Sequence, residues 1–237
     1  MEIIPVIDLK ADRVVRARMG QRHLYQPIET VLSPASDSLS IAAGLLSLYP
    51  FSTLYVADLD AIEGRGDHRA VLTQLKARHP QLTLWVDNGI ASADAAAAWL
   101  ETDLGCLVLG SETQRDICVV GDLVAHERVV LSLDFRGDAF QGPPELLEQP
   151  HIWPQRVIVM TLARVGSGAG PDLERLAAIR RAAPAHKLYA AGGVRDRADL
   201  IALRRGGIDG ALIASALHDG RVVANDIAEV QRCTAAG

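Results

Sequence analysis

Two aspartates have the residue type and the surroundings that proton-transfer chemistry requires. Asp8 and Asp134 each close a short apolar run, in Ile7-Asp8-Leu9-Lys10 and Leu133-Asp134-Phe135-Arg136. Two carboxyl groups at the ends of facing strands can act as general base and general acid on one substrate, each protonated as its surroundings dictate. The alternative is that each is a helix N-cap or an isolated surface acid, since aspartate is common in both places.

Small residues and hydroxyls follow four other apolar runs. Gly89 and Gly110-Ser111 correspond to Gly192-Gly193 and Ala214-Ser215, and the same 104 positions separate Gly89 from Gly193 and Ser111 from Ser215. Glycine lets backbone N–H groups approach an anion closely, and a hydroxyl adds a donor, so each group suits a phosphate. A single Gly-Gly dipeptide usually marks a turn. The repeat, however, predicts two phosphate sites on opposite sides of one mouth, and a substrate with a phosphate at each end.

Further polar candidates lie close to the ends of other apolar runs. Asp58 and Asp60 are expected on the same side of their strand, where either holds a substrate hydroxyl or amine, or joins a network with arginines. Arg16 and Arg18 follow the first run and either meet a phosphate or carboxylate or are solvated. Thr161 is the polar group that the sixth run offers at its end.

The elements that must position these residues are short apolar runs alternating with amphipathic stretches. Several runs are apolar almost throughout, which is typical of parallel strands covered on both faces. The expected strands are 3–9, 53–59, 82–86, 106–109, 129–133, 157–162, 188–191 and 211–213. The expected helices are 39–48, 69–78, 93–100, 117–125, 173–181 and 197–204. This alternation predicts an α/β fold, a (β/α)8 TIM barrel, because a doubly wound sheet would need a glycine-rich turn after its first strand.

The repeat also predicts how the barrel is divided. A period near half the chain indicates two half-barrels, about 1–125 and 126–237, within a single domain. Residues just past the strand carboxyl ends line the active face of such a barrel. Asp8 and Asp134, on the first and fifth expected strands, are therefore expected to face each other across the mouth.

Composition narrows the class of protein. The 237 residues are 49% hydrophobic and 22% charged with a net charge of −5, which excludes a disordered chain and a basic surface for nucleic acid. No apolar run is long enough to cross a membrane, and no secretory signal opens the chain. The cysteines Cys106, Cys118 and Cys233 fit reduced thiols. We expect a cytoplasmic monomer or small homo-oligomer that binds a phosphorylated small molecule and uses no metal and no cofactor.

Five segments together carry a family resemblance over nearly the whole chain. They are Ile4-Pro-Val-Ile-Asp-Leu-Lys10, Val56-Ala-Asp-Leu-Asp60, Leu131-Ser-Leu-Asp134, Gly192-Gly-Val194 and Ala214-Ser-Ala-Leu217. In this order they resemble the HisA/HisF family of histidine-biosynthesis barrels. The resemblance implies two half-barrels around a substrate with two phosphates. For HisA it implies an Amadori isomerisation of an aminoaldose to an aminoketose, with Asp8 as base, Asp134 as acid and Thr161 in the place of a family threonine.

One loop departs from that family pattern. After the third expected strand the chain reads Asp87-Asn88-Gly89-Ile90-Ala91, where the family usually carries Gly-Gly-Gly-Ile-Arg. An acidic Asp87 would repel a phosphate unless it points elsewhere or binds a different group. Segments 19–27 and 58–66 resemble a HisA-related subgroup of methanogens and methylotrophs.

These departures keep several functions open. The subgroup implies a paralogue that acts on another phosphorylated substrate in methanopterin- or methanofuran-type one-carbon cofactor synthesis. A non-catalytic barrel that binds a phosphorylated ligand is a second hypothesis. A HisF-like synthase that takes ammonia from a glutaminase partner is a third.

Overall fold

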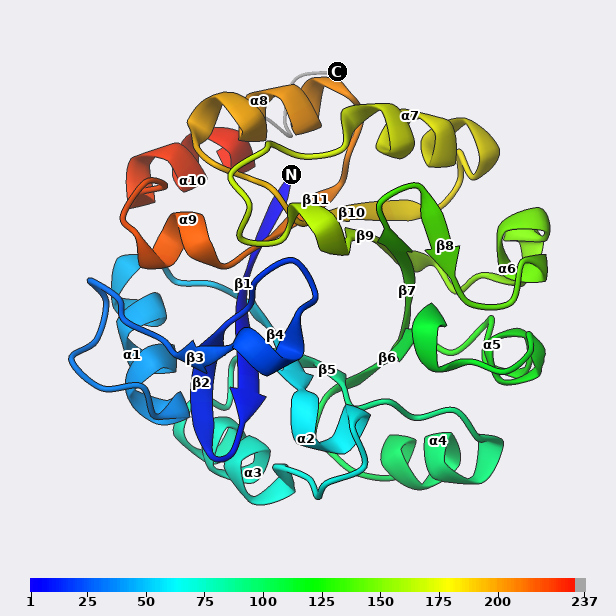
Figure 1. Ribbon diagram of the computed structural model, residues 1–237, viewed down its shortest axis with the longest axis horizontal. Coiled ribbons are helices and arrows are strands. Elements are labelled where there is room, and N and C mark those ends of the chain that lie inside the picture. The colour runs from blue at the N-terminus through cyan, green and yellow to red at the C-terminus, as the bar shows by residue number, and fades with distance from the viewer. Residues whose placement is uncertain (233–237) are drawn as a thin grey trace.

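The computed structural model describes residues 1–232 and contains a closed barrel of eight parallel strands surrounded by helices (Figure 1). The strands follow one another around the barrel in chain order, and the last pairs with the first. The predicted (β/α)8 architecture is therefore confirmed. The barrel strands are β1 (Glu2–Lys10), β4 (Thr53–Asp58), β5 (Thr83–Asp87), β6 (Cys106–Gly110), β7 (Val129–Arg136), β9 (Arg156–Thr161), β10 (Lys187–Ala191) and β11 (Gly210–Ile213).

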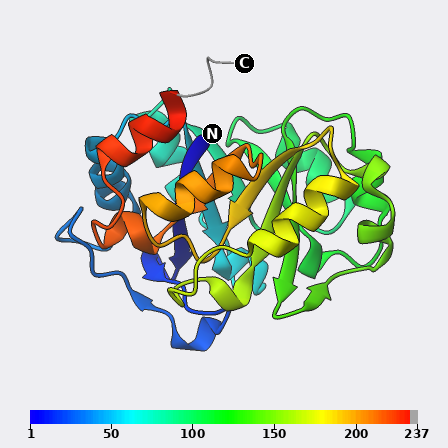
Figure 2. The same ribbon diagram turned by 90° about the horizontal axis from the view of Figure 1, so that it is seen from above.

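Helices cover the outside of the barrel, and Figure 2 shows α7, α8 and α10 lying along its outer side in yellow, orange and red. The longer helices are α1 (Ser38–Leu48), α3 (Arg69–Arg78), α4 (Ala93–Leu100), α7 (Leu173–Ala182), α8 (Arg197–Arg205) and α10 (Ala224–Arg232). The shorter ones are α2 (Leu59–Ile62), α5 (Cys118–Asp122), α6 (Glu145–Glu148) and α9 (Ser215–His218). No helix within residues 1–232 combines the length and the apolar character needed to span a bilayer.

The helix starts follow from local capping. The side chains of Asp37, Ser92, Asp172 and Asp196 each accept a hydrogen bond from a backbone N–H of the first turn that follows. Such caps satisfy donors that a helix start leaves unpaired. The helix expected over 117–125 is shorter than predicted, because α5 already ends at Asp122 after a glycine of low helix propensity.

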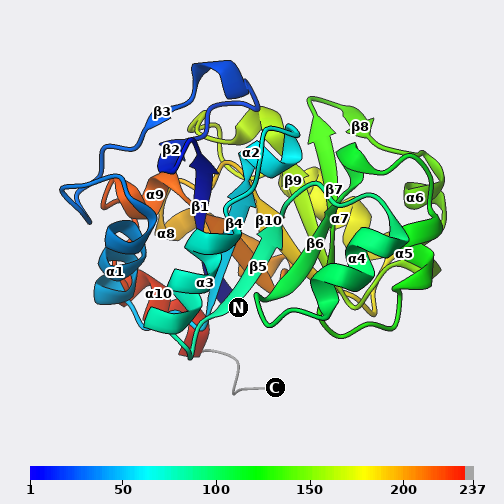
Figure 3. The same cartoon turned by 90° about the horizontal axis from the view of Figure 1, so that it is seen from below.

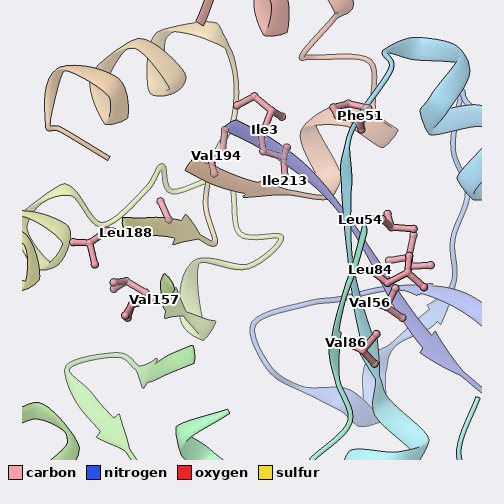
Figure 4. Close-up of a cluster of buried hydrophobic side chains, with 14 of the residues drawn as sticks. Ile3, Phe51, Leu54, Val56, Leu84, Val86, Val157, Leu188, Val194 and Ile213 are labelled. Carbon is pink, nitrogen blue, oxygen red and sulfur yellow. The ribbon is translucent and has the colours of Figure 1, made fainter. Parts of the chain in front are cut away.

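Alternation along the strands divides the core into two sets of side chains. One set fills the barrel and includes Ile4, Tyr55, Trp85, Val130 and Ile158. The other set faces the helices, and Figure 4 shows part of it, including Leu54, Val56, Leu84, Val86 and Val157. Because successive strand residues point to opposite faces, this alternation decides which polar residues near the strand ends enter the barrel.

Two hairpins, which the strand pattern did not predict, extend the barrel at one end. The strand β2 (Arg13–Arg16) runs antiparallel to β1 and is joined by β3 (Gln26–Pro27), while β8 (Ala139–Gln141) runs antiparallel to β7. Figure 3 shows β2, β8 and α2 gathered at the end of the barrel opposite the amino terminus. Asp8 pairs with Val15 and Asp134 with Gln141, so both strands continue past their aspartate instead of ending there.

Two of the three cysteines lie within residues 1–232. Cys106 is buried in the barrel and Cys118 is exposed, and both are free thiols. Cys233 lies outside the described residues.

Candidate active site

A cavity opens at the carboxyl ends of the barrel strands, and it brings together part of the predicted site. Asp8 and Asp134 both line it, together with Gly192-Gly193 and Ala214-Ser215. The remaining candidates do not line it; they are Arg18, Asp58, Gly89, Gly110, Ser111 and Thr161.

Strand parity explains why three aspartates enter the barrel. Asp8 lies four residues after the inward-facing Ile4, and Asp87 lies two residues after the inward-facing Trp85. Asp134 lies four residues after Val130 in the same way. Each aspartate side chain therefore points to the interior of the barrel, and all three aspartates line the cavity.

Asp134 is held in place by a set of hydrogen bonds. Ser132 Oγ donates to its Oδ1 at 2.7 Å, and the Glu112 backbone N–H donates to its Oδ2 at 3.3 Å. Ser111 Oγ lies 3.2 Å from the same Oδ2 and accepts the Asp134 backbone N–H at 2.9 Å. Burial raises the pKa of Asp134 to about 7, and the charge of Asp87 adds to this while the Ser132 hydrogen bond opposes it.

Asp8 has no such support. Its carboxyl group makes no hydrogen bond to any residue of the described chain, although it lines the cavity. Burial raises the pKa of Asp8 to about 7; the Arg22 charge lowers it and the Asp87 charge raises it. Two carboxyl groups with a pKa near neutrality in one cavity can hold and exchange protons at physiological pH, which is what general acid and base catalysis requires.

Asp87 and Glu112 form an acidic side of the cavity. Asp87 accepts hydrogen bonds from Tyr55 Oη at 3.3 Å and from the Gly89 backbone N–H at 3.3 Å. Burial raises the pKa of Asp87 to about 6, and that of the buried Tyr55 well above its usual value. Glu112 is ion-paired with Arg22, which the segment after β2 brings to the cavity.

Sequence reasoning singled out Asp87 by its departure from the family pattern, but missed Arg22 and Glu112. No motif marks either residue. Their meeting joins the short helix η1 (Arg22–Leu24) to η2 (Ser111–Thr113), 90 positions apart in the chain. Arg136 was also missed; it lines the cavity, and its guanidinium group makes no hydrogen bond or ion pair within residues 1–232.

The loops after β10 and β11 present free donors to the cavity. Gly193 has φ +90°, and a Cβ there would lie 2.2 Å from Gly170 O, so only glycine fits this close backbone approach. Neither the Gly193 backbone N–H nor Ser215 Oγ makes a hydrogen bond within the described residues. Arg164 and Arg221 line the same cavity. This side of the cavity can therefore bind an anion.

In the repeat-related loops after β5 and β6, the residues that the sequence assigns to a second phosphate site do not line the cavity. Ser111 is fully buried, and its Oγ is bonded to Asp134 and lies 2.7 Å from Gln141 O. Gly110 is buried beneath the carboxyl groups of Asp87 and Asp134, and Gly89 packs against Ile62. The Ser111 hydroxyl and the two glycines on this side therefore make contacts with other residues of the protein and are not open to a ligand.

Asp58 and Thr161 were expected in the site but face the surrounding helices. Asp58 shares the strand parity of the outward Leu54 and Val56 and is 1% exposed. Its oxygens accept the backbone N–H of His68 at 2.8 Å and of Ala61 at 3.2 Å, so it caps α2. Tyr55 and Ala57 point to the barrel interior, so the alternation along this strand already predicts that Asp58 points outward.

Thr161 follows the outward Val157 and Val159, and its Oγ1 accepts a hydrogen bond from Arg175 at 3.3 Å. Met160 takes the inward position at this strand end and lines the cavity. The assignment of Thr161 as a catalytic residue is therefore not supported by its position.

The remaining polar candidates lie around the mouth. Arg18 is exposed, while its neighbour Ala17 lines the cavity. Arg16 pairs with Asp219 at 2.9 Å, and Asp60 accepts the Ala11 backbone N–H at 2.8 Å. The side chains of Arg16 and Asp60 therefore hold loops together and do not line the cavity.

Two loops meet over the cavity. The Met19 backbone N–H, after β2, donates to Val165 O at 2.8 Å, after β9. Ala17 O lies so near Gly166 that a Cβ there would come within 2.6 Å of it. Lys10 Nζ donates to Arg22 O at 2.6 Å and further anchors the first of these loops.

Comparison with known proteins agrees with this architecture. The family profile described as histidine biosynthesis protein matches residues 2–223. The chain belongs to this family. The family resemblance predicted from its motifs is thereby confirmed.

Three relatives in the family illustrate its range. A protein of Stenotrophomonas maltophilia, named as the isomerase of an imidazole-4-carboxamide with two phosphoribosyl groups, is 30% identical over 254 residues, or 98% of each chain. A protein of Lactiplantibacillus plantarum with the same name is 29% identical over 250 residues, or 98% of this chain and 100% of the relative. An uncharacterized protein of Methanocaldococcus jannaschii is 28% identical over 227 residues, or 93% of this chain and 94% of the relative.

Proposed function

We propose that this protein is an isomerase that converts a phosphorylated aminoaldose to an aminoketose by proton transfer between Asp8 and Asp134. The observation that carries the proposal is the presence of both carboxyl groups in one cavity, each with its pKa raised to about 7. The isomerase names of the relatives from Stenotrophomonas maltophilia and Lactiplantibacillus plantarum, which include a phosphoribosylamino group, support the same reaction class.

The two environments favour different roles in an Amadori rearrangement. Asp134 in its protonated form donates to the sugar ring oxygen as the ring opens to a protonated Schiff base. Asp8 as a carboxylate then removes the proton from the neighbouring carbon, which gives an enaminol that becomes the aminoketose. Asp8 suits the base because no protein donor occupies its oxygens, whereas the hydrogen bonds to Asp134 fix the orientation of its carboxyl group.

The phosphate of the substrate is placed at the loops after β10 and β11. The free Gly193 backbone N–H and the free Ser215 hydroxyl supply hydrogen bonds, and Arg164 and Arg221 supply positive charge on the same cavity. Anchoring the substrate by a group that does not react holds the sugar carbons in position for proton transfer.

A steady-state assay of the wild type beside Asp8→Asn and Asp134→Asn tests the proposal. The substrates are the relatives' compound with two phosphoribosyl groups and an N-substituted ribosylamine with one 5-phosphate. We expect each variant to lose about 1,000-fold in kcat because it removes one proton-transfer group, while the affinity for inorganic phosphate stays unchanged. Variants that keep the wild-type rate would show that the two carboxyl groups are not the acid and base.

A second candidate is a related enzyme with a changed phosphorylated substrate, in methanopterin- or methanofuran-type one-carbon cofactor synthesis. Asp87 and Glu112 favour a changed substrate, since they put negative charge in the cavity. Turnover of a compound with one phosphate, without turnover of the relatives' compound, would favour this candidate. A barrel that only binds its ligand would turn over neither.

A further inference from the structure

The charges around the cavity are distributed unevenly. Its acidic lining residues are Asp8, Asp87, Glu112 and Asp134, and all of them lie on β1, β5, β7 or directly after β6. The segments that follow β9, β10 and β11 contribute no acidic residue to the lining within the described chain. They contribute Arg164 and Arg221 instead, whose ion-pair partners Asp172 and Asp219 do not line the cavity.

The acidic side lies where the repeat would place a second phosphate. The 104-position offset aligns Asp87 with Ala191 and Glu112 with Ala216. In Figure 1, β5 and β6 lie across the barrel from β10 and β11. The two half-barrels therefore present equivalent loops to opposite sides of the cavity, one with carboxylates and one with alanines.

The donors that would bind a second phosphate are also occupied. Ser111 Oγ is bonded to Asp134, and the Glu112 backbone N–H donates to the same carboxyl group at 3.3 Å. The Gly89 backbone N–H donates to Asp87 at 3.3 Å. Two arginines also line the cavity from this half of the barrel: Arg22 is already ion-paired with Glu112, and the guanidinium group of Arg136 lies beside Gly20 instead. A phosphate here would meet negative charge and find no free donor on Ser111, Gly89 or Glu112.

We infer that the site takes a substrate with a single phosphate, bound beside Gly193 and Ser215, and that Asp87 and Glu112 are specificity-determining residues that exclude a second phosphate. The opposite end of the substrate instead offers hydrogen-bond donors to these carboxyl groups. The inference rests on the proposed function, since it concerns the same cavity and the same phosphate side.

Calorimetric binding to the wild type tests this directly. The three probes are the relatives' compound with two phosphoribosyl groups and the two forms of it that lack one phosphate or the other. We expect one singly phosphorylated form to bind at least as tightly as the doubly phosphorylated compound, and the other at least 100-fold more weakly. If both singly phosphorylated forms bind at least 10-fold more weakly than the parent, or if none of the three compounds binds, the inference is overturned.

A variant in which three first-half loop residues are replaced by their second-half counterparts provides a sharper test. Asp87→Ala, Asn88→Gly and Glu112→Ala together give the first-half loops the residues found at 191, 192 and 216. This triple variant is expected to gain at least 10-fold in preference for the doubly phosphorylated compound, and no gain contradicts the roles of Asp87 and Glu112. Its thermal unfolding is checked first, and the wild-type comparison decides the question if the variant does not fold.

These binding measurements need no turnover, so the two proposals can fail separately. If a second phosphate adds nothing to the affinity of the wild type, but the wild type has no isomerase activity that Asp8→Asn abolishes, only the proposed function is refuted. An active isomerase that needs both phosphates would refute only the single-phosphate inference.

Discussion

The two sides of the cavity share one loop pattern, but the hydrogen-bond donors of the two sides have different partners. Ser215 and Gly193 keep their donors free for a ligand, whereas Ser111 and Gly89 direct theirs to Asp134 and Asp87. One side is therefore equipped to bind an anion, and the other to hold carboxyl groups. A repeat in sequence preserves where a backbone turns, but the partners of each side chain decide whether its donors stay free or bind a carboxyl group of the protein.

The largest expected contrast comes from the matched glycines. Gly193→Ala puts a Cβ 2.2 Å from Gly170 O, and Gly89→Ala puts one 2.8 Å from Ile62 Cα, both at positive φ. Both variants are strained, but we expect only Gly193→Ala to weaken phosphate binding, by about 100-fold, because Gly193 lines the cavity and Gly89 does not. Titration calorimetry with the wild type's singly phosphorylated ligand measures it. Equal losses in the two variants would remove the contrast between the sides.

The matched serines are expected to separate ligand affinity from stability. Ser215→Ala removes a free hydroxyl and should weaken phosphate binding by about 10-fold with little change in the free energy of unfolding. Ser111→Ala removes a fully buried hydroxyl bonded to Asp134 and should lower that free energy by about 2 kcal/mol. Urea unfolding and calorimetry on both variants check this. A stability loss confined to Ser215→Ala would reverse the assignment.

Under the proposed function, we expect Asp87 to influence the pH dependence of the reaction. Burial is the larger cause of the raised pKa of Asp8 and of Asp134, and the negative charge of Asp87 adds to both. Asp87→Asn removes that charge, so both pKa values fall and both limbs of the kcat/KM profile move to lower pH, by roughly 0.5 to 1 unit. Asp138→Asn, at an exposed position outside the cavity, is the control. A shift to higher pH would contradict this coupling.

The smallest effect compares Asp8 and Asp134, the two aspartates that we propose as base and acid. The pKa of Asp8 is about 7 in the folded chain against its ordinary 3.8, so the folded state binds the proton more tightly and stability falls as pH rises between these values. Asp8→Asn removes this cost and should raise Tm at pH 8 by about 2 to 5 °C, and by less at pH 5. Asp134→Asn should bring no rise, because an asparagine amide can accept through only one of the two atoms to which Ser132 Oγ and the Glu112 backbone N–H donate. Thermal scans at both pH values measure the difference, and equal rises for the two variants would contradict it.

The regular part of the fold was predictable because its signal is local. Each of the eight expected strands overlaps a barrel strand, and the ranges expected for the helices 69–78 and 93–100 agree with α3 and α4. Continuous apolar runs and helical periodicity depend on neighbouring residues alone. The hairpins of β2, β3 and β8 escaped prediction because such short strands are specified by their pairing with β1 and β7.

The position of a candidate site residue was predictable where strand alternation and the repeat place it, and where no hydrogen-bond partner within the protein occupies it. Asp8 and Asp134 lie in the cavity as expected, and so do Gly193 and Ser215. The position of Ser111 outside the cavity lining was not predictable, because its hydroxyl partner, Asp134, lies 23 positions away and no pattern in the sequence links them. The positions of Asp58 and Thr161 were predictable, since the alternation along their own strands already turns both away from the barrel interior.

The hydrogen bond between Met19 and Val165 has a kinetic consequence. Ala17, Gly20 and Arg22 line the cavity from one of the two loops that it joins, and Val165 and Gly166 line it from the other. A bound molecule that touches both loops adds its own contacts to that closure, so the two loops separate more slowly when the cavity is filled. Under the proposed function, we expect release of product to require opening of these loops, so that the rate of opening sets an upper limit on the turnover number, however fast the proton transfers are.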